Sequence, residues 1–199
     1  MARLVRFIIP SWDEVCNLAT SLAEQIRGRF APDVIVGVAR GGLIPARLMS
    51  DFLNVSTLLT VGVAFYADID KRGKEPRITQ ALPSHITGKN LLVVDDVADT
   101  GRSLEVVVAE LRKHQLDIRT ATLYRKPWVE FKPDFYAKET DAWIVFPWER
   151  RETVRKIAGR VAGAGKNFQE VEDQLVSAGM KRPLAHDLVK AIAREVSQL

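Results

Sequence analysis

Two short apolar runs constrain the fold of this chain more than any other feature. VIVGV at 34–38 and LLVV at 91–94 contain no charged or polar side chain, so they lack the alternation of a strand with one face in water. Strands of this kind are typical of parallel sheets that helices cover on both faces. Segments with apolar residues at helical spacing follow them, at 43–52 and 103–114. The alternation predicts an α/β fold with a mainly parallel, twisted sheet flanked by helices.

The segment before the first run is expected to be helical. Ser11 and Glu14 fit a capping box, and apolar residues follow at helical spacing, which predicts a helix over about 12–27. Cys16 is the single cysteine, so an intramolecular disulfide is excluded. Its neighbours Val15 and Leu18 predict a small core residue rather than a nucleophile.

The last fifty residues differ in texture from the rest. Residues 150–199 contain ten Lys/Arg and six Asp/Glu, a balance of +4 that accounts for the whole net charge of the chain. Apolar residues at helical spacing predict three short helices, separated by glycines at 163 and 165 and at 179. The positive charges are scattered rather than striped, so no nucleic acid is expected as a partner. We expect a core at 1–149 and a small helical extension at 150–199.

The N-terminal region gives no sign of export or membrane insertion. Arg6 interrupts the apolar stretch from Leu4 to Ile9, and Pro10 closes it, unlike a signal peptide. No apolar run reaches the length needed to span a bilayer. These features predict a cytoplasmic protein without a membrane partner.

The run at 91–94 leads into DDVADTGRS, where chemistry-bearing residues gather. Asp95 and Asp96 are adjacent carboxylates beside a buried strand, so they need hydrogen-bond donors or a cation. A sugar diol would supply the donors and Mg²⁺ the cation. Thr100, Gly101 and Ser103 precede a helix and suit a phosphate, although a capped strand-to-helix turn uses the same residue types. Together the two features indicate a site for a ribose 5-phosphate.

A second glycine-containing loop follows the run at 34–38. In GVARGG, Arg40 offers a guanidinium to an anion, and Gly41 and Gly42 permit unusual backbone angles. The spacing matches neither the dinucleotide fingerprint nor a Walker sequence. Open parallel sheets bind ligands at the carboxyl ends of their strands, where both loops lie. A ligand with phosphate at one end and pyrophosphate at the other would need both.

These motifs resemble those of the type I phosphoribosyltransferases. VVDDVADTGRSL is similar to the phosphoribosyl-pyrophosphate motif, and GVARGGLIPARLM resembles the pyrophosphate loop with its following helix. RKPWVEFKPDFYAKETDAWIVFPWE, within a base-binding region at about 124–149, resembles the xanthine-guanine branch. The resemblance covers most of 33–149. It implies the type I phosphoribosyltransferase fold and a purine salvage transferase that moves phosphoribosyl from phosphoribosyl pyrophosphate to guanine, hypoxanthine or xanthine.

On the donor side, the resemblance implies that Asp95 and Asp96 contact the ribose hydroxyls and the Mg²⁺ shell, with Asp96 as the metal ligand. Arg40 and Gly41 would face the pyrophosphate. The residues that would surround the 5-phosphate are Ala98, Asp99, Thr100, Gly101, Arg102 and Ser103.

On the base side, the resemblance implies that Lys126 donates to the purine O6. Trp143 would stack on the ring, and Ile144 would line the pocket. Asp99 would accept the proton of N7, so Asp99 and Arg40 are the expected catalytic residues. A basic stretch at about 66–82 would act as a mobile lid that excludes water. A homodimer or higher homo-oligomer is also implied.

Two other functions remain open from the sequence. An adenine phosphoribosyltransferase would need an acceptor for the exocyclic amine where Lys126 presents a donor. A non-catalytic regulator that senses phosphoribosyl pyrophosphate would need no purine pocket, yet the Lys126 and Trp143 motifs are present. The histidines His85, His114 and His186 have no spacing typical of a metal site.

Overall fold

The computed structural model describes residues 6–67, 74–83, 86, 90–114, 116–163 and 168–196. Contacts within the chain divide it into two compact units, one formed by residues 15–140 and the other by residues up to 14 together with 141 onward. We call them the larger and the smaller unit. The division predicted from the sequence, a core at 1–149 and a helical extension at 150–199, stays a prediction.

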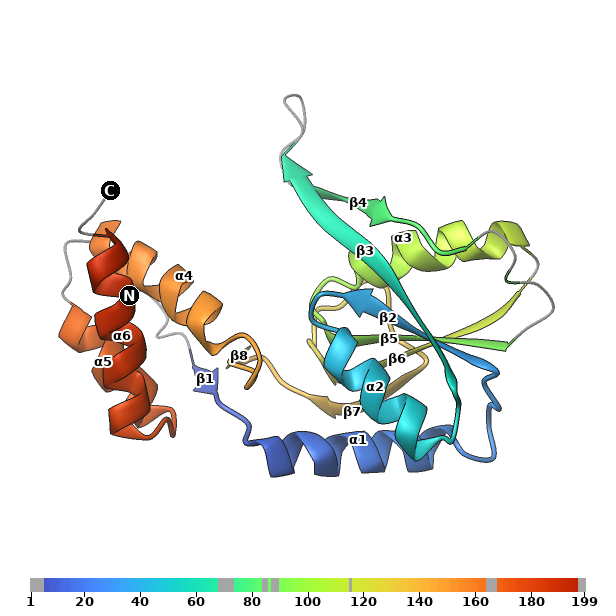
Figure 1. The fold of residues 1–199 in the computed structure, drawn as a ribbon, viewed down its shortest axis with the longest axis horizontal. Helices are drawn as coiled ribbons and strands as arrows, with labels where there is room; N and C mark the ends of the chain where they lie inside the picture. The colour runs from blue at the N-terminus through green and yellow to red at the C-terminus, as the bar shows by residue number, and fades with distance from the viewer. Residues whose placement is uncertain are drawn as a thin grey trace. The chain divides into compact units, whose positions relative to one another are not determined.

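The larger unit is built on a six-stranded sheet with the order β4-β3-β2-β5-β6-β7 (Figure 1). All neighbouring strands pair in parallel except β3 and β4, which are antiparallel. The predicted α/β fold with a mainly parallel sheet is therefore confirmed. The strands are β2 (Val34–Ala39), β3 (Thr57–Ala67), β4 (Lys74–Gln80), β5 (Asn90–Ala98), β6 (Asp117–Arg125) and β7 (Phe135–Glu139).

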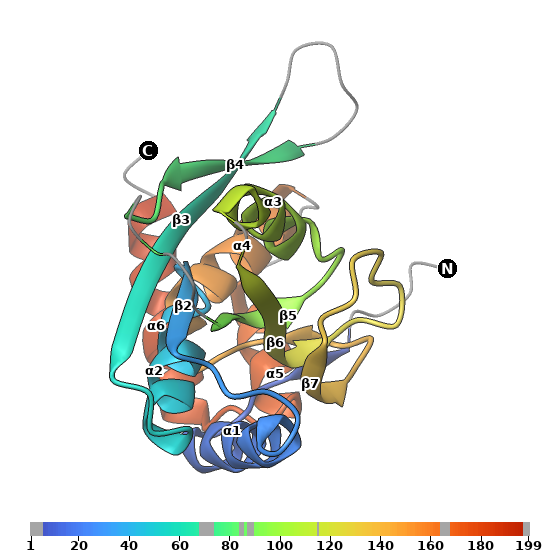
Figure 2. The same ribbon diagram turned by 90° about the vertical axis from the view of Figure 1, so that its right-hand side faces the viewer.

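Helices α2 (Leu43–Phe52) and α3 (Arg102–Leu111) lie on opposite sides of this sheet (Figures 1 and 2). The α3 side buries one alternate set of strand residues, including Val36 and Val93, against Leu104 and Val107. Successive strand residues point to opposite faces, so Ile35 and its counterparts serve the other face. Continuous apolar runs are thus required, because both faces of the central strands are covered. A short 3₁₀ helix, η1 (Arg112–His114), follows α3.

Helix α1 (Trp12–Ile26) begins in the smaller unit and continues in the larger one. The capping box is present, because Ser11 Oγ accepts the N–H of Glu14 and the Glu14 carboxylate accepts the N–H of Ser11. The core prediction for Cys16 is wrong, since this thiol is exposed. One residue along a helix rotates the side chain by about 100°, which turns Cys16 away from the buried face. That face consists of Val15, Ala19, Leu22, Ala23 and Ile26.

Strand β5 extends further than the apolar run predicts. It continues from Val94 through Ala98, so Asp95 and Asp96 lie within the strand rather than in a loop after it. Pairing with β6 sustains the extension, with Asp95 opposite Thr122 and Ala98 opposite Arg125. A polar residue can form the main-chain hydrogen bonds of a strand as well as an apolar residue can. These bonds therefore hold the acid pair on a rigid element.

The stretch expected to act as a lid at 66–82 contains strand β4. Residues 74–80 pair with the end of β3, Ala67 opposite Lys74 and Gly62 opposite Gln80. The segment contains Pro76, which is tolerated at the edge of a sheet. Residues 68–73, within the stretch expected to act as a lid, lie outside the described residues.

The smaller unit contains a short parallel pair, β1 (Phe7–Ile8) with β8 (Trp143–Ile144), and three helices. The helices are α4 (Arg150–Gly163), α5 (Phe168–Ser177) and α6 (Arg182–Val196), which confirms the helical tail. Their apolar residues form one core with Val145. Gly179 has φ +103° just after α5, as expected of a helix C-terminus.

In the described parts of the chain, no helix has the length and apolar character needed to cross a membrane.

Candidate functional site

Two of the predicted site loops follow neighbouring strands of the sheet. Strands β2 and β5 pair in parallel with Gly37 opposite Val94, so the loops after them begin at the same edge. Gly42 occupies the N-cap of α2 and Gly101 that of α3, and neither N-cap residue supplies a side-chain cap. The N–H of Leu43 donates to the carbonyl of Arg40 at 3.3 Å, and that of Arg102 donates to Thr100 Oγ1 at 3.4 Å. The positive end of each helix dipole lies at the loop before the helix. This arrangement suits two anionic groups bound side by side.

The glycine cap of α3 is enforced by a close contact. Gly101 has φ +85°, and a Cβ there would lie 2.1 Å from the carbonyl oxygen of Phe131. The carbonyl of Thr100 accepts the N–H groups of Glu130 and Phe131 at 3.0 and 3.1 Å. The 126–131 loop is thus docked on the loop at 99–101. A capped turn alone would not need this close approach of two backbones.

The acid pair is buried and closely hydrogen-bonded. Asp95 is 9% exposed and Asp96 is 8% exposed. The N–H of Asp96 donates to Asp95 Oδ1 at 2.9 Å, and the N–H of Val97 donates to Asp96 Oδ1 at 2.7 Å. Burial, and then the charge of Asp96, raise the pKa of Asp95 well above its ordinary value. Two crowded carboxylates of this kind gain from a cation or from hydroxyl donors.

Gly41 brings the loop after β2 directly onto this pair. A Cβ on residue 41 would lie 2.2 Å from Asp96 Oδ2, so a glycine is needed for the loop to pass. The neighbouring Arg40 is exposed, and the peptide bond before it is cis. Arg40, Gly41, Asp95 and Asp96 are therefore gathered at one edge of the sheet, as the sequence predicts for a shared site.

The acid pair fits a divalent cation that arrives with its ligand. Within the described ranges, no three His, Cys, Asp or Glu side chains are grouped as a metal site. Asp95 and Asp96 supply two neighbouring, interacting carboxylates near the end of β5. Mg²⁺ commonly takes one or two protein carboxylates and completes its shell with phosphate oxygens and water. The donor set is thus adequate for Mg²⁺ shared with a phosphorylated substrate.

The loop after β6 places Lys126 beside the end of β5. Its N–H donates to the carbonyl of Ala98 at 2.9 Å, and its side chain is buried. Trp128 follows, 53% exposed, and its indole N–H donates to Asp99 Oδ1 at 2.8 Å. The Lys126 Nζ lies 5.6 Å from the Trp128 ring centre. Trp128 was not predicted as a site residue; its place directly after Lys126 and Pro127 was the available signal.

Arg102, in the predicted phosphate site, is partly engaged by the protein, and Ser103 is partly buried. The N–H of Arg102 donates to Thr100 Oγ1 at 3.4 Å, and its guanidinium lies 3.9 Å from Glu130. Ser103 is half-buried in the first turn of α3. The side chain of Arg102 therefore shares an exposed ion pair, and its role toward phosphate remains a prediction.

Trp143 and Ile144 form β8 and belong to the smaller unit. The N–H of Trp143 donates to the carbonyl of Arg6 at 2.8 Å, and that of Val145 donates to Ile8 at 2.9 Å. Trp143 is half-buried beside the core of that unit. The predicted contact of Trp143 and Ile144 with a base remains a prediction.

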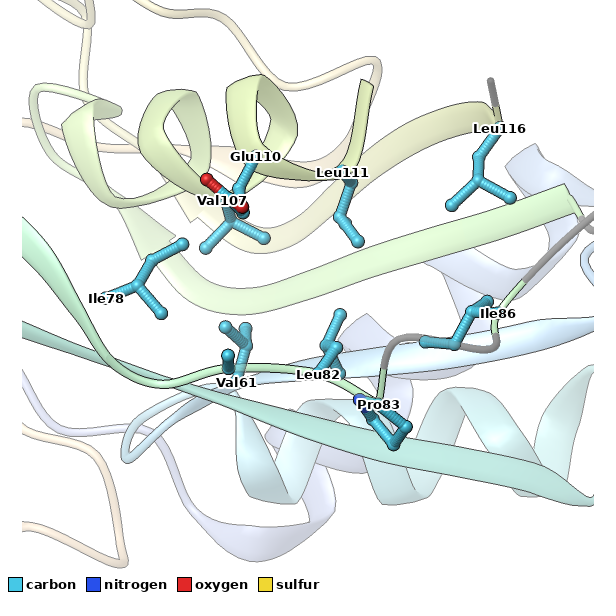
Figure 3. Close-up of a pocket in the computed structure, with 10 residues that line it drawn as sticks. Val61, Ile78, Leu82, Pro83, Ile86, Val107, Glu110, Leu111 and Leu116 are labelled. Atoms are coloured by element: carbon cyan, nitrogen blue, oxygen red, sulfur yellow. The ribbon is translucent and has the colours of Figure 1, made fainter. Parts of the chain in front are cut away.

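An apolar pocket lies beside α3 (Figure 3). Its lining extends from Leu116, just before β6, to Val61, which pairs with Val38 near the carboxyl end of β2. None of the predicted site residues lines this pocket. The other lining residues labelled in the figure include Val61, Ile78, Leu82, Val107 and Leu111.

Comparisons with known proteins agree with this geometry. The phosphoribosyl transferase domain family matches residues 11–152. The xanthine-guanine phosphoribosyltransferase of Cereibacter sphaeroides is 33% identical over 148 residues, covering 70% of this chain and 84% of the relative. That of Gluconobacter oxydans is 32% identical over 150 residues, covering 73% and 86%.

Solved structures give the same result. A purine phosphoribosyltransferase from Pyrococcus horikoshii is 43% identical with a TM-score of 0.65, covering 71% of this chain and 93% of that one. A Neisseria gonorrhoeae protein solved with bound ppGpp is 29% identical with a TM-score of 0.67, covering 82% and 99%. The fold predicted from the sequence is confirmed by these likenesses, and the chain belongs to the phosphoribosyltransferase family.

Proposed function

We propose that this protein is a purine salvage enzyme that transfers the phosphoribosyl group of phosphoribosyl pyrophosphate to a 6-oxopurine. The products are a purine nucleoside monophosphate and pyrophosphate. One observation carries the proposal: two glycine-capped helices follow neighbouring parallel strands and flank the buried Asp95–Asp96 pair. The relatives named xanthine-guanine phosphoribosyltransferase support the choice of base.

The donor would bind along the strand-end edge of the larger unit. The amides and hydroxyls at 99–103 would hold the 5-phosphate, and Asp95 and Asp96 the ribose hydroxyls. Arg40 and the Gly41 backbone would bind the pyrophosphate, whose negative charge matches the guanidinium and the N-terminus of α2. A ligand with phosphate at one end and pyrophosphate at the other would use both loops.

Mg²⁺ bound with the donor would neutralise charge on the pyrophosphate as it leaves. Asp95 and Asp96 would orient it through the donor hydroxyls, with Asp96 as the direct ligand. The raised pKa of Asp95 supports this role, because a pair that carries excess negative charge is stabilised by a cation.

On the base side, Lys126 would donate to the purine O6, and Trp143 and Ile144 would hold the ring. An ammonium group can donate a hydrogen bond to the O6 carbonyl of a 6-oxopurine. The amino group of adenine is itself a donor, so it cannot accept this hydrogen bond. Asp99 would accept the proton of N7 as the purine nitrogen attacks the anomeric carbon. We therefore favour a 6-oxopurine over adenine.

The chemical step would depend on charge and position. Departure of pyrophosphate leaves positive charge on the anomeric carbon, so catalysis rests on stabilising the leaving group and aligning the purine nitrogen. Arg40 does the first, and the base-side residues do the second. The β3–β4 ribbon would carry the lid that closes over the donor, and the exposed Arg77 on β4 would be one of its basic residues. Closure would exclude water, which otherwise hydrolyses the donor.

An assay with separate bases tests the proposal. The purified protein is incubated with phosphoribosyl pyrophosphate, Mg²⁺ and guanine, hypoxanthine, xanthine or adenine in turn. We expect nucleotide from at least one 6-oxopurine and little from adenine. Donor binding without transfer to any base would instead support a sensor of phosphoribosyl pyrophosphate, and preference for adenine would overturn the assignment of Lys126.

The similar Neisseria gonorrhoeae protein was solved with bound ppGpp, so we propose that ppGpp also binds this site. Its guanine and its pyrophosphate groups match the chemistry proposed for the base and donor sites. Addition of ppGpp should raise the KM for phosphoribosyl pyrophosphate without changing kcat. We also propose a cytoplasmic homodimer, which light scattering on the purified protein would test.

A further inference from the structure

Trp128 is an exposed aromatic residue that packing does not explain. Its side chain is 53% exposed, yet its indole N–H donates to Asp99 Oδ1 at 2.8 Å. The same ring lies 5.6 Å from the Lys126 Nζ, within reach of a cation–π interaction. One side chain thus contacts two groups that are separated by 27 residues in the sequence.

These two groups are the ones that the proposed function assigns to one edge of the base. O6 and N7 are neighbouring atoms on the same edge of a 6-oxopurine, so a donor for O6 and an acceptor for N7–H must stand side by side. Lys126 and Asp99 come from the ends of different strands, β6 and β5. Some element has to hold their side chains in a fixed relation.

We propose that Trp128 is a positioning residue that aligns Asp99 and Lys126 for the purine edge; this rests on the proposed function. The indole N–H occupies Asp99 Oδ1, which fixes the carboxylate plane and leaves Oδ2 for the N7 proton. The ring face holds the Lys126 ammonium near the same point. Trp128 acts through these two residues and takes no part in bond making.

The backbone around Trp128 is anchored on both sides, which makes such positioning effective. Before it, the N–H of Lys126 donates to the carbonyl of Ala98. After it, the N–H groups of Glu130 and Phe131 donate to the carbonyl of Thr100. Asp99 lies between these two acceptors in the sequence. The two loops are therefore joined by backbone hydrogen bonds on either side of Trp128, and its indole adds the contact with Asp99.

Two substitutions separate the two contacts. Trp128→Phe keeps an aromatic face and removes the N–H, whereas Trp128→Leu removes both. We expect Trp128→Phe to lower kcat about 10- to 100-fold, because a misplaced reacting group costs this much, with the KM for phosphoribosyl pyrophosphate unchanged. Its preference for 6-oxopurines over adenine should persist. Trp128→Leu should lose that preference as well.

Asp99→Asn provides the second readout. If the indole acts through the carboxylate, Trp128→Phe should slow the Asp99→Asn enzyme by less than about twofold, since the two substitutions remove one shared effect. Trp12→Phe is the matched control: Trp12 is 51% exposed, contacts Trp148 in the smaller unit and should leave kcat unchanged. Circular dichroism and calorimetry with donor and Mg²⁺ establish that each variant is folded and binds the donor.

The outcomes separate this inference from the proposed function. A wild-type protein that converts no 6-oxopurine overturns the proposed function and the inference with it. An active wild type with an unchanged kcat in Trp128→Phe overturns the inference alone. A full 10-fold loss on top of Asp99→Asn has the same consequence, because it would show that Trp128 acts independently of Asp99.

Discussion

Gly41 approaches Asp96 so closely that a Cβ on residue 41 would lie 2.2 Å from the carboxylate oxygen Oδ2. Real Cβ atoms do not come this near to an oxygen. The carboxylate is itself held by the N–H of Val97 at 2.7 Å, so it has little freedom to turn aside. The proposed pyrophosphate loop and the proposed metal ligand are therefore one packed unit, and a change in one disturbs the other.

Gly41→Ala should abolish donor binding and lower stability together. The added methyl group must displace either the Asp96 carboxylate or the loop backbone, and either movement separates Arg40 from the acid pair. We expect at least a 100-fold loss of affinity for phosphoribosyl pyrophosphate with Mg²⁺, measured by calorimetry. Thermal unfolding should occur several degrees lower, since overpacking costs about 1–3 kcal/mol.

A double variant tests the cause. In Gly41→Ala/Asp96→Ala, the carboxylate that clashes is gone, so the melting temperature should recover relative to Gly41→Ala while donor binding stays absent. If the melting temperature of the double variant stayed as low as that of Gly41→Ala, the methyl group would clash with another part of the protein. Retention of donor affinity by the single variant would contradict the assignment of this loop to pyrophosphate.

Asp95→Asn should stabilise the protein without ligand at neutral pH. Burial and the charge of Asp96 raise the pKa of Asp95 in the folded state above its ordinary value of 3.8. A carboxyl with a raised pKa contributes its stability below that ordinary value and loses it as pH rises through the raised pKa. Above that range the folded state carries an unfavourable charge, which asparagine removes.

The measurement compares melting temperatures of variant and wild type from pH 4 upward. The difference should be small at the acid end and should grow in favour of the variant as pH rises; about 1 kcal/mol corresponds to about 2–4 °C in a chain of this size. Asp51→Asn, at an exposed carboxylate on α2, should show no such trend. A difference that is constant or falls with pH would contradict the cause given for the pKa. The variant should also lose affinity for the donor.

The central elements were predictable because local and tertiary signals agree there. The apolar runs of β2 and β5 are buried on both faces, and Ser11 with Glu14 caps α1 as its spacing predicts. The edge ribbon was not predictable. Strand β4 contains Pro76 and polar residues, and it exists through main-chain pairing with β3 rather than through a buried face.

The part of the site that lies within one sequence motif was predictable. Asp95, Asp96 and the loop at 99–103 are contiguous, so their chemistry can be inferred from the sequence. The Gly41–Asp96 and Trp128–Asp99 contacts join separate segments, and no local pattern encodes them. The core prediction for Cys16 failed for a simpler reason. The adjacent Val15 faces the core, whereas the position of Cys16 on the helix turns its side chain outward.

Lys126→Ala should reduce turnover of 6-oxopurines much more than it reduces donor binding. The Lys126 side chain is buried, so its removal takes away the proposed O6 donor while the loop stays anchored through backbone hydrogen bonds. We expect kcat/KM for the base to fall about 100-fold or more, in line with the loss of a charged hydrogen bond of about 3 kcal/mol. Steady-state kinetics with each base gives this value.

Lys138→Ala is the control for a general effect of charge. Lys138 is an exposed lysine on β7 of the same unit, and its removal should leave all kinetic constants near those of the wild type. If Lys126→Ala were as active as the wild type on guanine and hypoxanthine, Lys126 would not belong to the base site. An equal loss in donor affinity would instead place it at the donor.

Glu172→Ala should loosen the smaller unit and leave the donor site intact. Glu172 on α5 is 7% exposed, and its carboxylate accepts Arg182 Nη1 at 3.0 Å and contacts His186 Nδ1 at 3.0 Å, both on α6. Short helices persist through mutual packing, so this link to a buried carboxylate should matter for the α5–α6 pair. Hydrogen exchange should speed up in both helices, and calorimetry should give unchanged affinity for phosphoribosyl pyrophosphate.

Asp187→Ala, at an exposed position on α6, should alter neither measurement. Because the link lies wholly within one unit, an exchange rate that stays unchanged in Glu172→Ala would mean that apolar contacts around Leu175 and Ile192 suffice to hold the helices.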